Sequence, residues 1–216
     1  VFGVAQALAY IEGHGIVHRD IKPSNILVDT KGTARLADLG MAKVVAEAGL
    51  TQSGAVLGTP HYIAPEQAIG DQVDIRADLY ALGITLFRLV TGQLPFEGDA
   101  FLDVVTKHVN EDVPDPRQMA PDVTQGVAQL IAGLCARDPA ERYPTAKAAA
   151  EDVARALLGQ APEGPGTAPA TVGGDPKTSR WTDVQGRAYP RGLEATPLRG
   201  GQVPPALDPT PRAPVT

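Results

Sequence analysis

Four polar side chains near the start of the chain have the types and the spacing that phosphoryl transfer requires. A carboxylate, an ammonium group and an amide lie within the segment His18–Asn25, and a second carboxylate follows at Asp38. Phosphoryl transfer needs an oriented nucleophile, metal ions on the phosphates, and neutralisation of the developing charge. Asp20 can accept the proton of a substrate hydroxyl, and Lys22 can steady the transferred group. Asn25 and Asp38 offer the oxygen ligands that Mg²⁺ prefers.

A short β-hairpin is predicted to position the two metal ligands. Ile26–Val28 is a run of three apolar residues, typical of a short buried strand, and residues 34–37 return as its partner. Residues 29–32, Asp-Thr-Lys-Gly, are typical of a turn. Because a hairpin brings its two ends together, we expect Asn25 and Asp38 to lie close together, as a shared magnesium site requires.

Apolar spacing predicts a mainly α-helical chain around this hairpin. Residues 78–90 are apolar almost all round, which is typical of a helix in the middle of a core, and Asp74 is its predicted N-cap. Further helices are predicted to end before Gly13, to begin at the cap Asp99, to cover residues 123–134, and to run from the cap Thr145 to Gly159. The predicted fold class is mainly α with one short β-hairpin.

The composition changes after residue 158. The 58 residues 159–216 hold 11 of the chain's 20 prolines and 9 of its 23 glycines. Such a segment cannot build a packed core. We therefore predict a folded domain over residues 1–158 and a Pro/Gly-rich disordered tail or linker over residues 159–216.

Charge and composition exclude several classes of protein. The net charge of -6 argues against a nucleic-acid partner, because phosphate backbones demand a basic surface. The only cysteine, Cys135, cannot form an intrachain disulfide, which suits a reducing compartment. Val1–Tyr10 lacks the basic region of a signal peptide, and the longest apolar run, residues 79–90, is too short to cross a bilayer. We expect a cytoplasmic protein without a membrane segment in this chain.

Several motifs in succession resemble those of protein kinases, and most closely the eukaryotic-type serine/threonine kinases of bacteria. They are His-Arg-Asp-Ile-Lys-Pro-Ser-Asn at 18–25, Asp-Leu-Gly at 38–40, Gly-Thr-Pro-His-Tyr-Ile-Ala-Pro-Glu-Gln at 58–67, Asp-Leu-Tyr-Ala-Leu-Gly at 78–83, and Arg-Asp-Pro-Ala-Glu-Arg-Tyr-Pro at 137–144. The resemblance covers residues 1–158. It implies the large, C-terminal lobe of the kinase fold, with the N-terminal lobe missing.

The resemblance also implies roles for individual residues, with ATP and Mg²⁺ as cofactors and proteins as substrates. Asp20 and Lys22 would be catalytic, Asn25 and Asp38 would bind the metal, and Lys22, Asn25, Leu27 and Asp38 would contact the nucleotide. Thr59 would lie near the substrate hydroxyl. The structural residues would be His18, Leu39 (where most kinases have phenylalanine), Glu66, Asp78, which anchors the catalytic loop, and Arg142, which pairs with Glu66.

The segment between Asp38 and Thr59 contains two hydroxyl residues that suit regulation. In the family, hydroxyls at the places of Thr51 and Ser53 are often phosphorylated, by a second copy of the same kinase or by another kinase chain. Arg19 would receive the new charge, because a guanidinium group matches phosphate geometry. The alternative is that Thr51 and Ser53 are ordinary polar loop residues.

The 17 residues before His18 contain no glycine-rich phosphate loop, no strand lysine and no partner glutamate, the parts with which a kinase grips ATP. The first interpretation is an active serine/threonine kinase of which this chain is one part, almost inactive alone. The second is a non-catalytic binding or regulatory module. The third is a degenerate fragment that does not fold stably, since a bare lobe would expose apolar residues such as Leu27.

Overall fold

The structure is a computed structural model that describes residues 1–38 and 60–166. The described residues are mainly α-helical with one two-stranded antiparallel sheet, which confirms the predicted class at this level. The helices are α1 (Phe2–Glu12), α3 (Pro65–Ile69), α4 (Ile75–Thr91), α5 (Phe101–Asn110), α6 (Gln125–Leu134) and α7 (Ala146–Leu157), and the strands are β1 (Ile26–Val28) and β2 (Ala34–Leu36). Short 3-10 turns cover Pro23–Asn25, Pro60–Tyr62, Pro116–Gln118 and Pro139–Glu141.

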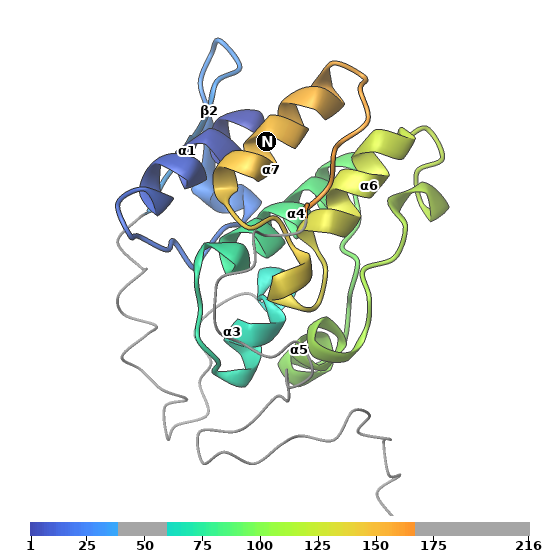
Figure 1. The fold of residues 1–216 in the computed structure, drawn as a ribbon. Helices are drawn as coiled ribbons and strands as arrows, with labels where there is room; N and C mark the ends of the chain where they lie inside the picture. The colour runs from blue at the N-terminus through green and yellow to red at the C-terminus, as the bar shows by residue number, and fades with distance from the viewer. Residues whose placement is uncertain (39–59, 167–216) are drawn as a thin grey trace, which may run out of the picture. The chain divides into compact units, whose positions relative to one another are not determined.

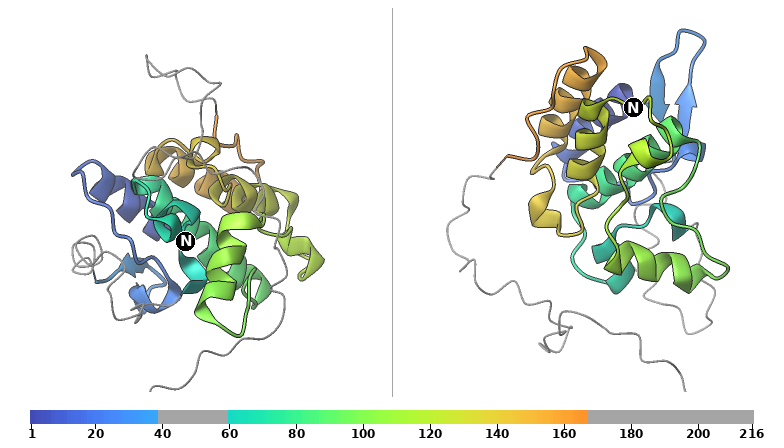
Figure 2. Two further views of the ribbon diagram at one scale, coloured as in Figure 1. Left: turned by 90° about the horizontal axis from the view of Figure 1, so that it is seen from below. Right: turned by 90° about the vertical axis from the view of Figure 1, so that its right-hand side faces the viewer.

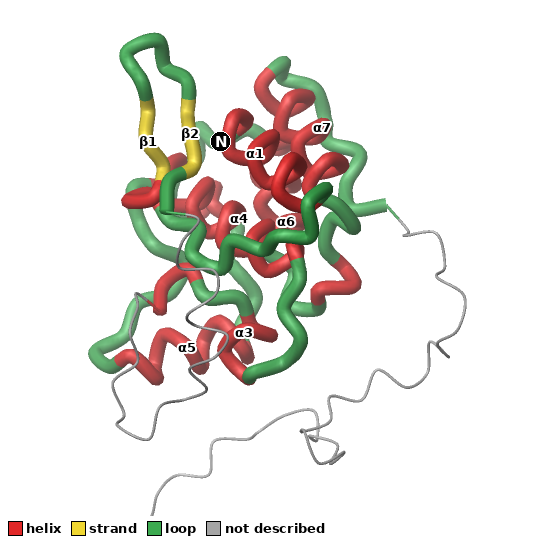
Figure 3. Tube along the Cα trace, turned by 90° about the vertical axis from the view of Figure 1, so that its left-hand side faces the viewer, coloured by secondary structure: helices red, strands yellow, loops and turns green. Residues whose placement is uncertain are grey.

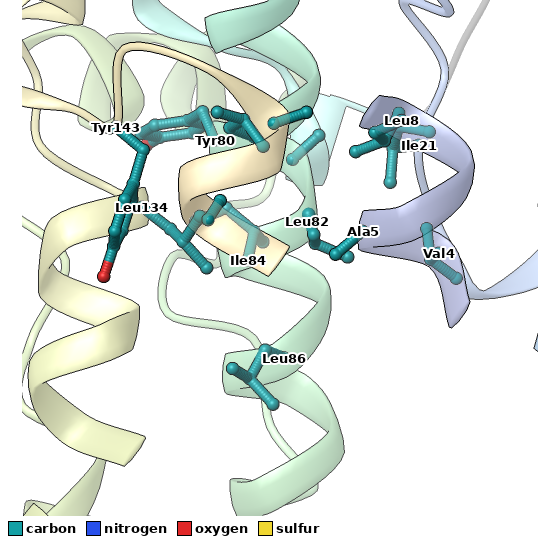
Figure 4. Close-up of a cluster of buried hydrophobic side chains, with 14 of the residues drawn as sticks. Val4, Ala5, Leu8, Ile21, Tyr80, Leu82, Ile84, Leu86, Leu134 and Tyr143 are labelled. Atoms are coloured by element: carbon teal, nitrogen blue, oxygen red, sulfur yellow. The ribbon is translucent and has the colours of Figure 1, made fainter. Parts of the chain in front are cut away.

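Helix α4 lies at the centre of the described residues (Figure 1). Its residues 77–87 are all buried because this part of the sequence is apolar almost all round, as predicted, whereas Arg88 and Leu89 in its last turn are exposed. Figure 4 shows Leu82 and Ile84 of α4 between Leu8 of α1 and Leu134 of α6. Every residue that the site depends on is therefore placed relative to one rigid central helix.

The helix ends agree with the predicted caps at two of three positions. The Asp74 carboxylate accepts a hydrogen bond from the Arg76 amide, and the Thr145 hydroxyl accepts one from the Ala148 amide. The prediction that Asp99 caps the next helix is wrong. Helix α5 begins after Ala100 instead, and the Asp103 carboxylate accepts the Ala100 amide at 3.0 Å. An acidic residue inside the first turn thus accepts the amide of the residue that precedes the helix.

Close approach of α4 and α6 depends on Gly83. A methyl group at this position would collide with Cys135 Sγ and lie 2.8 Å from Leu134 Cβ. Cys135 is buried, and burial raises the pKa of its thiol to about 12. It is a packing residue at the end of α6.

The β-hairpin pairs Ile26 with Leu36 and stands beside α1, as Figure 3 shows. The prediction that Ile26–Val28 is a strand is confirmed, but the prediction that it is buried is wrong, because Ile26 is only half-buried, Leu27 is 60% exposed and Val28 is 66% exposed. Helix α1 packs against strand β2 of the hairpin. There Gly3 approaches β2 so closely that a Cβ atom would lie 2.7 Å from the Ala34 carbonyl oxygen.

Residues 159–166, the C-terminal strap, turn back after α7 and pack against α6 (Figures 1 and 2). Gly126 and Gly133 of α6 leave room for Pro162 and Pro165. The buried Asp152 carboxylate accepts the amides of Glu163 at 2.9 Å and Gly164 at 2.8 Å, and the Tyr143 hydroxyl at 2.9 Å.

The strap corrects the beginning of the predicted tail. Composition placed residues 159–166 in the disordered segment, but these eight residues make specific hydrogen bonds, because Asp152 supplies buried acceptors that composition does not reveal. The prediction for the rest of the tail concerns residues 167–216, which lie outside the described residues. In the part of the chain that the structure describes, no helix has the length and hydropathy needed to cross a membrane.

We expect Asp152→Ala to lower the free energy of unfolding by roughly 2–4 kcal/mol, because it leaves the Tyr143 hydroxyl and two strap amides without their acceptor. Urea unfolding of the 216-residue chain measures this. The exposed Asp122→Ala is the matched control and should change the value by less than about 0.5 kcal/mol. A similar small change in both variants would show that the strap contributes nothing to stability.

Candidate active site

The Asp78 carboxylate on α4 holds the backbone of the segment that carries the predicted catalytic residues. Its Oδ2 accepts the His18 amide and its Oδ1 accepts the Arg19 amide, each at 2.7 Å. Burial raises the pKa of Asp78 to about 6, and the hydrogen bonds from His18 and Arg19 oppose that rise. The structure thus brings Asp78 to the position that the resemblance implied.

The buried His18 ring connects this segment to the base of the hairpin. Its Nε2–H donates to the Ala37 carbonyl at 3.0 Å, and its Nδ1 accepts the Asp20 amide at 3.3 Å. The two bonds require the proton on Nε2. His18 therefore holds Asp20 on one side and the residue before Asp38 on the other.

Asp20, Lys22 and Asn25 converge around one carboxylate oxygen. Lys22 Nζ lies 2.9 Å from Asp20 Oδ2, and Asn25 Nδ2 donates to the same Oδ2 at 2.8 Å and to the Asp20 carbonyl at 2.8 Å. Among the described residues, no hydrogen bond reaches Asp20 Oδ1. Oδ2 therefore holds the Asp20 carboxylate in place, and Oδ1 makes no hydrogen bond to the described residues.

Asn25 and Asp38 lie at the two ends of the hairpin, as predicted. The Ala37 amide donates to the Asn25 carbonyl at 2.9 Å, so Asp38 follows directly after the residue that pairs with Asn25. Asp38 is exposed and has a φ of 62°. Arg19, with a φ of 66°, is the other non-glycine residue of the described segments with positive φ. Both strained residues belong to this site, where such strain is usually found.

The donor set fits a magnesium ion bound to a phosphorylated ligand. Asn25 uses its Nδ2 for Asp20, so its Oδ1 and the Asp38 carboxylate are the oxygen atoms that would hold the metal. Residues 1–38 and 60–166 hold no group of three or more His, Cys, Asp or Glu side chains suited to a metal. Magnesium does not require one, because it keeps several waters and takes one or two protein carboxylates together with phosphate oxygens.

Glu66 and Arg142 form a buried, bidentate ion pair, with nitrogen–oxygen distances of 2.7 and 2.9 Å. Arg142 also donates to the carbonyls of Ala136, Arg76 and Arg137, and its guanidinium group lies 4.8 Å from the Tyr80 ring centroid. All its donors are thereby used. The pair fixes α3 to the start of α4, next to the site.

Five predicted positions are not part of this arrangement. Leu27 is exposed and contacts nothing that would assign it a role. The other four, Leu39, Thr51, Ser53 and Thr59, lie outside the described residues. In contrast, the structure adds one residue that sequence reasoning missed. Gln67 Nε2 donates to the Arg19 carbonyl at 3.2 Å. The sequence offered one signal, since Gln67 is the last residue of the kinase-like motif at 58–67.

Comparison with known proteins gives a consistent set of relatives. Residues 1–153 match the family model of the protein kinase domain. Serine/threonine-protein kinase PknB of Mycolicibacterium smegmatis is 41% identical over 162 residues, which cover 74% of this chain and 26% of that protein. Serine/threonine-protein kinase PrkC of Bacillus subtilis is 39% identical over 154 residues, 71% of this chain and 24% of that protein.

A third relative has a higher identity over a shorter match. DNA damage-responsive serine/threonine-protein kinase RqkA of Deinococcus radiodurans is 47% identical over 146 residues, 67% of this chain and 22% of that protein. The chain therefore spans about a quarter of the length of the curated relatives it matches.

The raised pKa of Asp78 predicts how stability depends on pH. Between the ordinary value of 3.8 and about 6, the folded chain holds a proton on Asp78 that the unfolded chain has released. The contribution of this group is therefore complete at low pH and is lost as pH rises through about 6. Asp78→Asn does not titrate, so the stability advantage of the wild type over this variant should shrink from about pH 4 to about pH 7.

Urea unfolding of both proteins across that range measures the difference. Asp71→Asn, an exposed loop substitution, is the control and should run parallel to the wild type. An advantage that grows with pH would contradict the prediction, because it would mean that the His18 and Arg19 amides outweigh the burial of the carboxylate.

Proposed function

The chain belongs to the protein kinase domain family, and on that premise we propose that it is the large lobe of a serine/threonine protein kinase. The proposed reaction transfers the γ-phosphoryl group of ATP to hydroxyl groups of serine and threonine residues in protein substrates. The relatives support this reading, since their names describe serine/threonine-protein kinases.

The observation that carries the proposal is the arrangement around Asp20. Lys22 and Asn25 both contact Oδ2, so Oδ1 is the atom that would accept the proton of the substrate hydroxyl. The hydroxyl oxygen would form the new bond to the γ-phosphorus while the bond to the leaving β-phosphate oxygen breaks. The ammonium group of Lys22 lies close enough to Asp20 to steady the phosphoryl group during this transfer.

Asn25 and Asp38 would hold Mg²⁺, which in this family neutralises charge on the phosphates. The Ala37–Asn25 hydrogen bond supports this pairing, because it keeps the two residues at adjacent positions of the hairpin. The exposed Leu27 on β1 would provide an apolar surface for the adenine ring.

Substrate recognition and regulation would involve the segment that precedes α3. Thr59 would contact the substrate, and Thr51 and Ser53 would be phosphorylated by a second copy of the kinase or by another kinase. Arg19, which is half-buried beside Asp20, would receive the added phosphate.

A binding or regulatory module without catalysis is the second candidate. The observation that favours it is the exposure of Leu27 and Val28 on the hairpin. Two neighbouring exposed apolar side chains of a strand suit contact with another protein or domain. In an active kinase the same surface would be covered by the small lobe and the nucleotide. A measurement of phosphotransfer activity therefore distinguishes the two functions, whereas the exposure of Leu27 and Val28 in this chain does not.

Phosphotransfer to a generic protein substrate with labelled ATP and Mg²⁺ tests the proposal. It is measured for the product of the complete coding sequence and for the 216-residue chain alone. We expect activity in the first and little or none in the second, because the parts that grip ATP are not among these residues. Strong transfer by the 216-residue chain would contradict the large-lobe assignment.

Asp20→Asn should lower the phosphotransfer rate of the complete product by roughly 10²–10⁴-fold, the usual contribution of a general base. The exposed Asp71→Asn is the matched control and should retain the wild-type rate. Unchanged activity in Asp20→Asn would reject the assignment of the base. Absence of activity in the wild type, with the chain folded, would favour the binding module.

A further inference from the structure

We propose that Gln67 is a positioning residue for the catalytic segment, because its side-chain amide holds the peptide group that joins Arg19 to Asp20. The proposal rests on the proposed kinase function, in which Asp20 is the general base. Gln67 touches none of the reacting groups. It acts through the backbone carbonyl of Arg19, to which its Nε2 donates a hydrogen bond at 3.2 Å.

The backbone at Arg19 requires such support. Its φ of 66° lies in the left-handed region, which is unfavourable for a non-glycine residue. A residue persists there only when its surroundings hold it in place. Asp78 holds the Arg19 amide at 2.7 Å, and this bond fixes the peptide group before Arg19. It leaves the orientation of the next peptide group undetermined.

That next peptide group sets the direction of Asp20. Its N–H donates to His18 Nδ1 at 3.3 Å, and its carbonyl accepts from Gln67 at 3.2 Å. Each bond alone is long, so rotation of the peptide group is opposed by two modest restraints acting at opposite ends. Loss of the Gln67 bond removes one of these restraints. It also leaves the half-buried Arg19 carbonyl without its donor.

Gln67 is well suited to this role because its own helix is immobilised. The neighbouring Glu66 is buried and paired with Arg142 through two hydrogen bonds. Pro65 begins α3 and Gly70 ends it with a φ of 78°. The donor is thus carried by a short helix that is fixed at Glu66 to Arg142 and reaches the catalytic segment from the next residue.

The same contact would couple substrate binding to catalysis. Helix α3 directly follows the segment that we propose for substrate recognition, and Gln67 is its contact with the catalytic segment 48 residues earlier. A substrate that binds next to α3 would therefore stabilise the Asp20 orientation through Gln67. This predicts an effect on the catalytic step and a smaller effect on ATP binding.

Three substitutions separate the hydrogen bond from the packing of the side chain. Gln67→Leu keeps a similar volume and removes the donor, Gln67→Glu places an acceptor against the Arg19 carbonyl, and Gln67→Lys retains a donor. Gln129→Leu, on an exposed face of α6, is the matched control. Thermal unfolding of each variant of the 216-residue chain establishes that it is folded.

The first measurement is amide hydrogen exchange in the 216-residue chain, which does not require activity. We expect the Asp20 amide to exchange roughly tenfold faster in Gln67→Leu and Gln67→Glu, and to remain close to wild type in Gln67→Lys and Gln129→Leu. Equal exchange in Gln67→Leu and the control would overturn the proposal, whatever the activity of the protein.

The second measurement is steady-state phosphotransfer by the product of the complete coding sequence. Misplacement of the base predicts a kcat about tenfold lower in Gln67→Leu, with the KM for ATP within roughly twofold of wild type, and recovery of most of kcat in Gln67→Lys. A rise in KM alone would overturn the positioning role. If instead Asp20→Asn is fully active, the proposed function fails, while the exchange result still decides whether Gln67 holds the peptide group.

Discussion

The buried Asp78 carboxylate is the contact on which the arrangement of the candidate site depends. Two backbone amides of the catalytic segment, at His18 and Arg19, donate to its two oxygens, and the carboxylate itself belongs to the central helix α4. Because residues 77–87 of α4 are all buried, its position cannot change without disturbing the whole core. A loop that must present a carboxylate with accurate geometry is thereby attached to the most rigid element of the domain.

This attachment has an energetic cost that the surrounding network offsets. Burial disfavours the charged form of Asp78, and the left-handed backbone at Arg19 is unfavourable for a residue with a long side chain. The ion pair between Glu66 and Arg142 immobilises α3 beside the site. From there Gln67 reaches the Arg19 carbonyl. The strain at the site is supported by contacts from several parts of the chain, as is usual where strain serves function.

Burial in the strap and in the hairpin differs from what the composition of each segment suggests. The strap is rich in glycine and proline, yet it is held, because Asp152 offers buried acceptors and two glycines of α6 leave room for its prolines. Strand β1 of the hairpin is apolar, yet Leu27 and Val28 remain exposed, while α1 packs against the partner strand β2. Composition describes what a segment can bury, while the neighbours present in the fold decide whether it is buried.

The sequence alone was sufficient for the features that arise from local contacts. The hairpin between Asn25 and Asp38, the main helices, the caps Asp74 and Thr145, and the grouping of Asp20 with Lys22 and Asn25 all follow from spacing over a few residues. Only the tertiary structure decided which distant groups meet. Gln67 and Arg19 are 48 residues apart, and neither periodicity nor composition encodes a contact over that distance, since it depends on how helices pack. The pairings of Asp78 with His18 and of Glu66 with Arg142 were implied only by resemblance to kinases, and the packed core around α4 is the physical reason that they form.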